Sequence, residues 1–340
     1  MKFRNNLVDS VRGLAIIIMF AANLWPYAVP MADCPIWLRI IFSTAAPLFI
    51  FLSGVSIAFA QEAGKPTGAL LKRIFQVLLI GVIIDALMWN IVPFYNFDVL
   101  YLISFSLLLI IGLSRIPAAF QILITAGILG ANLLLLGQYN FDMATIELSG
   151  NVSDFSITTA LHQFLIDGWF PVLPWSGVAF SGYLLAKYRY KLKPFSLGFS
   201  ITGLVLILLS VYLYVFKYDV VQPLREGYTE LFYPVKDYFW ILLFGIMISL
   251  IPVLNSNYAK AAPLTGIGKQ SLFLYLLHTM IIAFVIPLVT EETETTNWGM
   301  AALIFLGFYV LLIGIHHLMK PLLPALKNGK YKAIGFLLGF

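Results

Sequence analysis

The chain contains very little cysteine and very little charge, and each shortage excludes a class of protein. Cys34 is the only cysteine among 340 residues, which excludes an intramolecular disulfide framework and a cysteine-ligated metal cluster. Charged residues make up 11% of the chain, whereas soluble globular domains contain about 25%. The sequence also lacks low-complexity tracts and internal repeats. We therefore expect residues 1–340 to form a single domain that is not soluble.

Apolar residues take the place of charge, at 61% of the chain. They fall in repeated runs long enough to cross about 30 Å of hydrocarbon, which predicts an all-α, polytopic membrane helical bundle. The first run is too long for a cleavable signal peptide and carries Asn23, so we expect it to remain in the protein. We predict about ten transmembrane helices, at residues 11–29, 36–60, 73–93, 99–114, 117–137, 170–187, 195–216, 237–253, 270–289 and 299–319.

The basic residues predict how these spans are oriented. With a cytoplasmic N-terminus, all of the 21 basic residues fall in or beside cytoplasmic segments except Arg39, Lys217, Arg225 and Lys236. Basic residues on the cytoplasmic side set the orientation of membrane proteins. We expect a multi-pass cell (inner) membrane protein with both termini in the cytoplasm. Topology thus accounts for the net charge of +5, and we expect no nucleic-acid partner.

The first span carries a polar face. Arg12 and Asn23 are eleven positions apart, which places them within roughly 20° of one helix face and about 16 Å apart along the axis. Asp9 flanks the same face. Polar groups at membrane depth face a protein interior or a wet cavity rather than lipid. Arg12 suits the phosphates of a nucleotide-like ligand or an interfacial ion pair with Asp9, and Arg73 invites the same two interpretations.

His278 is the strongest ionisable candidate for catalysis. It lies about eight residues into the ninth span, and an imidazole suits removal of a proton from an acceptor hydroxyl or amine. A core histidine bonded to a neighbouring helix is the plain alternative. Asn23 suits polarisation of a thioester carbonyl or an ordinary interhelical hydrogen bond. Asp85, about 18 Å into the third span, is either a functional intramembrane acid or half of a structural pair.

Candidates for binding an acceptor lie toward the predicted outer side. Residues 138–169 and 217–236 form two large polar segments, which suit a hydroxyl-rich or amine-bearing acceptor or serve as connectors. His162 belongs to the first of them. Asp98 opens the fourth span, and Trp175 lies in the outer part of the sixth, where it would line a cavity or sit in an interfacial belt. His316 and His317 have no second ligand cluster at usable spacing, so we expect no metal.

Several segments, in order, resemble one family. VDSVRGLAIIIMFAAN and APLFIFLSGVSIAF look like the start of the heparan-α-glucosaminide N-acetyltransferase-like membrane acyltransferases. FDVLYLISFSLLL, PVLPWSGVAFSGYLLAK, YPVKDYFWILLFG and GKQSLFLYLLHTM are similar to later motifs. The resemblance covers nearly the whole chain. It implies transfer of an acyl group from cytoplasmic acetyl-CoA or another acyl-CoA, across the bundle, to a sugar, glycan or other envelope acceptor.

The resemblance also assigns residues, with one departure. It matches Asn23 to a site position, and Arg12, Arg73 and Asp9 are the candidates for binding the acyl-CoA. Relatives carry a histidine in the outer loop after the first span or near the Asn23 position, and this chain has none there. The base is therefore open among His278, His162, Asp33 and Asp98. A transporter or proton-coupled permease is the second function class, and homo-oligomerisation is left open.

Overall fold

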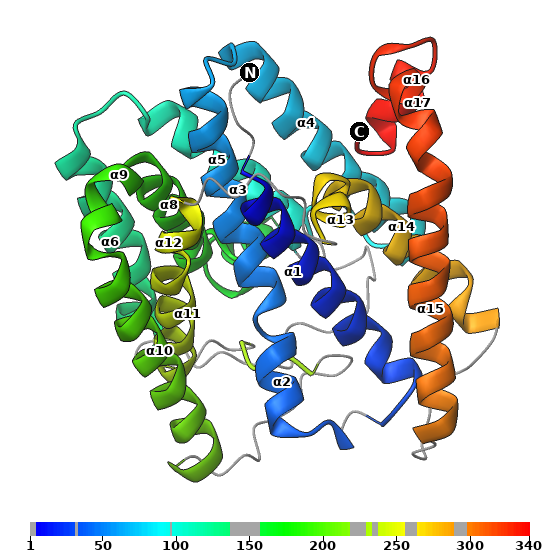
Figure 1. Cartoon of the computed structure of the whole chain (residues 1–340), viewed down its shortest axis with the longest axis horizontal. Coiled ribbons are helices and arrows are strands. Elements are labelled where there is room, and N and C mark those ends of the chain that lie inside the picture. The colour runs from blue at the N-terminus through cyan, green and yellow to red at the C-terminus, as the bar shows by residue number, and fades with distance from the viewer. Residues whose placement is uncertain are drawn as a thin grey trace. The chain divides into compact units, whose positions relative to one another are not determined.

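The computed structural model describes residues 5–30, 33–95, 97–136, 157–217, 229–232, 237–255, 264–288 and 298–340 (Figure 1). Helices are the regular elements of this described part of the chain, and the predicted all-α membrane bundle is confirmed. Five helices are long and apolar enough to cross a membrane, and three shorter ones are apolar. We therefore treat the chain as a membrane protein.

Helices lie at all ten predicted spans. In chain order they are α1 (Asn6–Leu24), α2 (Ile36–Phe42) with α3 (Ala45–Glu62), α4 (Thr67–Ile84) with the π-helical turn η3 (Asp85–Trp89), α5 (Val99–Leu113), α6 (Ala118–Leu136), α8 (Val172–Lys187), α10 (Ser196–Tyr212) with η8 (Leu213–Lys217), α11 (Asp237–Ser249) with α12 (Ile251–Leu254), α14 (Ser271–Phe284) with η9 (Ile286–Leu288), and α15 (Trp298–Met319). Short elements connect them: η1 (Trp25–Tyr27), α7 (Ile157–His162), η6 (Gln163–Asp167), α9 (Arg189–Leu192), η7 (Lys193–Phe195), α13 (Thr265–Lys269), η10 (Lys320–Leu322), α16 (Leu323–Asn328) and α17 (Lys332–Leu337).

The second predicted span, 36–60, contains two helices with a turn between them, and together they form one stretch, Ile36–Glu62, that is long and apolar enough to cross a membrane. α2 ends at Phe42 and α3 begins at Ala45. Pro47 lacks the N–H that would bond the carbonyl of Ser43, and its ring would clash with that carbonyl. The Ser43 hydroxyl donates to the Arg39 carbonyl at 2.6 Å and accepts from the Leu231 amide at 2.7 Å. At the break, the buried Ser43 hydroxyl thus links α2 to the segment that contains Leu231.

The chain divides into two compact units built from discontinuous segments. Unit 1 comprises residues 1–4, 47–204 and 245–257, and unit 2 comprises residues 5–46, 205–244 and 258–340. The expectation of a single domain over residues 1–340 stays a prediction.

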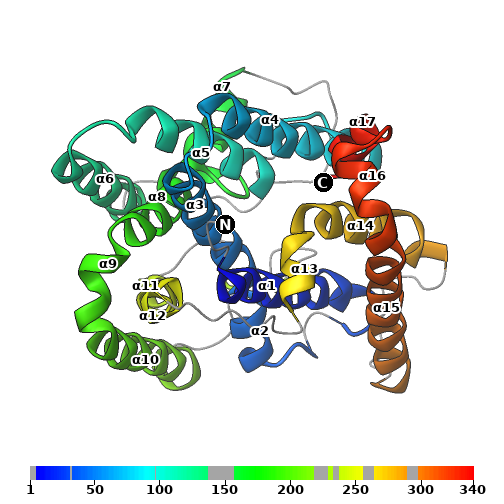
Figure 2. The same ribbon diagram turned by 45° about the horizontal axis from the view of Figure 1, so that its top comes forward.

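Unit 1 packs α4 and α6 against the neighbouring pair α5 and α8 (Figures 1 and 2). Small residues let α3 and α8 cross closely: a Cβ on Gly54 would overlap the Ala179 carbonyl, and one on Gly182 would overlap the Phe51 carbonyl. Close approach at glycine is typical of membrane helix pairs. Gln121 of α6 is buried and donates to three carbonyls at the end of α5, those of Leu113, Ser114 and Ile116.

Unit 2 is organised around α1, and both views show α13 and α14 between α1 and α15 (Figures 1 and 2). α13 crosses α1 at very short range, because a Cβ on Gly13 would overlap the Leu264 carbonyl and one on Gly268 would overlap the Asp9 carbonyl. The buried hydroxyls of Ser10 and Thr265 join the same two helices at 2.8 Å. This crossing fixes the segment that leads into α14, the helix that carries His278.

Candidate functional site

The polar face of α1 begins at a capped N-terminus. The Asn5 side chain accepts hydrogen bonds from the amides of Leu7 and Val8, at 3.0 and 3.2 Å, and so satisfies two donors that a helix start leaves unpaired. One turn later, Arg12 Nη1 lies 2.9 Å from Asp9 Oδ1. Asp9 is buried and Arg12 is half-buried. The predicted pairing of these two residues is therefore present, and it holds the guanidinium at one end of the helix.

Asn23 and His278 meet inside unit 2. Asn23 Nδ2 lies 3.0 Å from His278 Nε2, although the two residues are 255 positions apart. His278 is fully buried, and Asn23 is half-buried. Of the predicted catalytic residues, both belong to this pair. Asn23 lies on α1 and His278 on α14. Because α13 packs against α1 and leads directly into α14, this crossing holds α14 next to α1.

The hydrogen bonds of His278 determine which ring nitrogen carries the proton. Nδ1 bonds to the backbone carbonyl of Tyr275. Because a carbonyl only accepts, Nδ1 carries the hydrogen, and a neutral ring then presents a lone pair at Nε2. The Asn23 amide donates to this lone pair. The ring is thus held in the tautomer that a general base acting through Nε2 requires.

Aromatic rings pack around the His278 side of the pair. The His278 ring lies 4.8 Å from the Phe20 ring and 5.1 Å from the Tyr275 ring, centre to centre. Phe308 of α15 packs edge-on against Phe20 at 5.6 Å. Tyr309, the next residue, donates its hydroxyl to the Ile17 carbonyl at 2.7 Å. α15 therefore closes the side of α1 that carries Phe20, and His278 is fully buried beneath these rings.

The predicted donor-binding and acceptor-binding residues of unit 1 each make a separate contact. Arg73 is exposed and donates to the buried Gln76 side chain. Asp98 caps α5, because its carboxylate accepts from the Val99 amide at 2.6 Å. Trp175 is buried against Phe170, with ring centres 5.5 Å apart, so it is not part of an interfacial belt. Arg73 and Arg12 belong to different units, and a joint phosphate site for them stays a prediction.

Three further candidates have defined positions. His162 is half-buried at the end of α7, and Asp33 is exposed. Asp85 accepts a hydrogen bond from the Tyr101 hydroxyl at 2.6 Å, with both groups buried. Much of the predicted acceptor-binding segments 138–169 and 217–236 lies outside the described residues.

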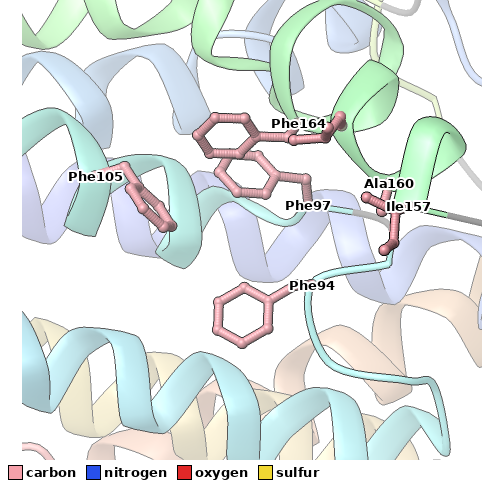
Figure 3. A pocket seen from close by; sticks show the side chains of 7 residues that line it. Phe94, Phe97, Phe105, Ile157, Ala160 and Phe164 are labelled. Atoms are coloured by element: carbon pink, nitrogen blue, oxygen red, sulfur yellow. The ribbon is translucent and has the colours of Figure 1, made fainter.

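One pocket of unit 1 was not predicted from the sequence. It measures about 210 Å³ and is lined by Phe94, Phe97, Phe105, Ile157, Ala160, Leu161 and Phe164. Figure 3 shows the four phenylalanine side chains with Ile157 and Ala160 around it. The Phe97 and Phe164 rings meet edge-on, with centres 4.6 Å apart. Every lining residue is apolar. The pocket therefore lacks the basic side chains that the phosphates of coenzyme A would require.

The arrangement can now be compared with known proteins. The family model described as heparan-alpha-glucosaminide N-acetyltransferase, catalytic, matches residues 4–208, which is more than half of the 340 residues. The chain belongs to this family. The resemblance predicted from the sequence motifs is thereby confirmed, and the protein is a membrane protein of the acetyltransferase kind. The family in general uses acetyl-CoA as the donor.

The family match covers one partner of the polar pair and leaves the other outside. Asp9, Arg12 and Asn23 lie within residues 4–208, whereas His278 lies beyond them. No curated protein and no solved structure matches the chain. The structure joins His278 to the matched segment through its hydrogen bond with Asn23. Within the described residues, no group of three or more His, Cys, Asp or Glu side chains gathers as metal ligands would, and the expected absence of a metal stays a prediction.

Proposed function

We propose that this protein transfers an acyl group, acetyl or another short one, from cytoplasmic acyl-CoA to an acceptor on the outer side of the cell membrane. The acceptor is a sugar, a glycan or another envelope component, and both O- and N-acylation fit the proposal. The hydrogen-bonded pair of Asn23 and His278 carries it, because that pair joins a base to an amide donor on α1, a helix within the segment that the acetyltransferase family model matches.

The pair supports a direct transfer in one step. The acceptor oxygen or nitrogen attacks the thioester carbonyl carbon, a new C–O or C–N bond forms, and the C–S bond breaks. His278 Nε2 takes the proton that the acceptor loses and returns it to the departing thiolate, so that coenzyme A leaves as the thiol. In the resting protein the Asn23 amide occupies Nε2. When the acceptor replaces it there, the amide becomes available to the thioester oxygen, where a preorganised donor stabilises developing negative charge.

The polar face of α1 gives this proposal a direction. The Asp9–Arg12 ion pair lies at the predicted cytoplasmic end, and Asn23 lies eleven residues further along the helix. That separation corresponds to about 16 Å. We propose that Arg12 binds phosphate oxygens of the donor while Asp9 holds the guanidinium in place, with Arg73 as a second cation. Trp175, Asp98 and His162 remain proposed acceptor-side residues.

Release of coenzyme A thiol tests the proposal. Purified protein in proteoliposomes receives acetyl-CoA and an extract of envelope glycans and lipids, and a thiol reagent follows free coenzyme A over time. We expect release that depends on the extract and a matching gain of acetyl mass in one extract component. If the protein moves a solute across the vesicle membrane and releases no thiol, it is a transporter and the proposal is wrong.

A further inference from the structure

The apolar pocket of unit 1 is a cavity that the proposed reaction does not use. It measures about 210 Å³, and its walls come from the turn between η3 and α5, from α5 itself, and from α7 with η6 (Figure 3). An apolar cavity stays dry, and one of about 150 Å³ holds a molecule of benzene. On that scale the pocket has room for a hydrocarbon segment of roughly eight carbons.

The turn between η3 and α5 has an uncommon backbone conformation. Asn90, Phe94 and Phe97 have positive φ angles of 52°, 68° and 49°. This left-handed conformation is unfavourable for bulky side chains, and it persists where the surrounding structure imposes it, often at binding sites. The Phe94 ring packs against the Tyr101 ring, with centres 4.5 Å apart. Because Phe94 and Phe97 both line the cavity, the strained residues of the turn include two that form its wall.

Contacts from three segments hold this wall in place. The Phe97 carbonyl accepts a hydrogen bond from the Phe170 amide at 3.1 Å, and the next residue but one begins α5, capped by Asp98. The Phe97 and Phe164 rings meet edge-on with centres 4.6 Å apart, and the Phe164 and Phe105 rings do so at 5.1 Å. The cavity is therefore preformed, and a ligand binds without the cost of ordering its walls.

The rim of the pocket indicates the medium that it faces. Ile157, Leu161 and Phe94 line the pocket and are 74%, 54% and 40% exposed. Exposed apolar side chains are stable against hydrocarbon rather than water, and the turn joins the predicted outer ends of the third and fourth spans. Every lining residue is apolar, so a charged group inside would have no partner. An occupant therefore inserts an apolar part and keeps its polar part outside.

We propose that this pocket binds one hydrocarbon chain of an outer-leaflet membrane phospholipid, whose headgroup stays at the membrane surface. The proposal rests on the cavity and its membrane setting, and it does not depend on acyl transfer. A concave wall contacts the chain from several sides, whereas the exposed side of α10, with Leu204 and Leu208, contacts a lipid from one side only. The pocket should therefore retain a lipid more strongly than the rest of the apolar surface.

Photolabelling of the purified full-length protein in detergent tests this retention. The probe is a phosphatidylethanolamine with a diazirine in one acyl chain, and tandem mass spectrometry locates the adducts. We expect labelling that saturates with added probe. Adducts on Leu161 and Phe164 should exceed those on Leu204 and Leu208 at least about fivefold, because the enclosed chain makes more contacts.

Variants that fill the pocket sharpen the test. Ala160→Phe places a ring in the cavity and should lower the labelling of the other lining residues about tenfold or more. Ala302→Phe adds the same ring at an exposed position of α15 and should leave that labelling within about twofold of wild type. Leu161→Trp covers the mouth from an exposed position, so it keeps the test valid if circular dichroism shows that Ala160→Phe does not fold.

Unlabelled competitors separate a phospholipid from an acyl-CoA that carries the same kind of chain. Dioctanoyl-phosphatidylethanolamine should displace the probe from the pocket, and octanoyl-CoA at the same concentration should not. Stronger displacement by octanoyl-CoA would assign the pocket to the acyl chain of the donor and overturn the proposal. Labelling that does not saturate, equal labelling of α10, or unchanged labelling in both Ala160→Phe and Leu161→Trp would also overturn it.

Discussion

Each of the two units contains a polar pair within its predicted spans, and the two pairs differ in which groups they leave available for reaction. In unit 1, Tyr101 donates to Asp85 at 2.6 Å between successive helices, 16 residues apart. In unit 2, Asn23 and His278 meet at 3.0 Å from opposite ends of the chain. The Asp85–Tyr101 contact uses the only hydroxyl proton of its donor. The Asn23–His278 contact holds a neutral imidazole with its basic nitrogen toward a partner that a substrate can replace.

This comparison shows that a buried ionisable group is not by itself a functional site. Asp85 and His278 are both intramembrane groups of the kind usually assigned a function. Only His278 has a tautomer fixed for proton transfer, through Tyr275, and a neighbouring amide that can polarise a carbonyl. We therefore propose a catalytic role for the pair in unit 2 and a structural role for the pair in unit 1.

Replacement of His278 gives the largest expected loss. His278→Gln keeps a hydrogen-bonding side chain but removes the base, so kcat for coenzyme A release should fall about 10²- to 10⁴-fold. His316, a second buried histidine of unit 2, is the control, and His316→Gln should retain most of the activity. Equal losses in both variants would show that the comparison is wrong and that any buried histidine here is structural.

Replacement of Asn23 gives a smaller loss. Asn23→Ala removes the amide that orients the ring and would serve the thioester oxygen, so kcat should fall about 10- to 10³-fold. Asn23→Asp carries a negative charge toward the thioester oxygen and should not restore the rate. Both are measured by thiol release per folded molecule. A rise in KM with unchanged kcat would place Asn23 in binding rather than in the reaction.

Changes at the pair in unit 1 should affect stability more than rate. Asp85→Ala leaves the buried Tyr101 hydroxyl without its acceptor, which costs about 1–3 kcal/mol. Thermal unfolding in detergent should show this loss, and Asp85→Asn, which keeps an acceptor oxygen, should show less of it. Thiol release per folded molecule should stay near the wild-type value. If Asp85→Asn abolishes activity while the protein remains folded, Asp85 belongs to the chemistry and the contrast between the units fails.

The sequence was sufficient to predict the helices and to single out Asn23 and His278 as candidates, for a physical reason. Apolar runs of membrane length form helices wherever they lie, so all ten predicted spans contain helices. Asn23 and His278 stood out because polar groups at membrane depth are costly. Their contact could not be predicted, since helical periodicity describes one helix and gives no information on which helices are neighbours.

Other features could be recognised only from the fold. From the sequence, Arg39 was one of four basic residues on the predicted outer side. The structure shows that it is buried and that it donates to the Thr229 carbonyl. The break at Ser43 follows from Pro47, four residues later, whose effect a count of apolar residues does not detect. Asp98 stays a predicted acceptor contact, and its carboxylate also caps α5, a contact that depends on the backbone around it.

A double-mutant cycle tests most directly whether Asn23 and His278 act as one unit. The thiol-release rate is measured for wild type, Asn23→Ala, His278→Gln and the double variant under identical conditions. Residues that act together in one step lose their contribution once, so the double variant should be no more than about threefold slower than His278→Gln alone. If the two losses multiply in full, the residues act independently and the hydrogen bond between them is not the centre of the reaction.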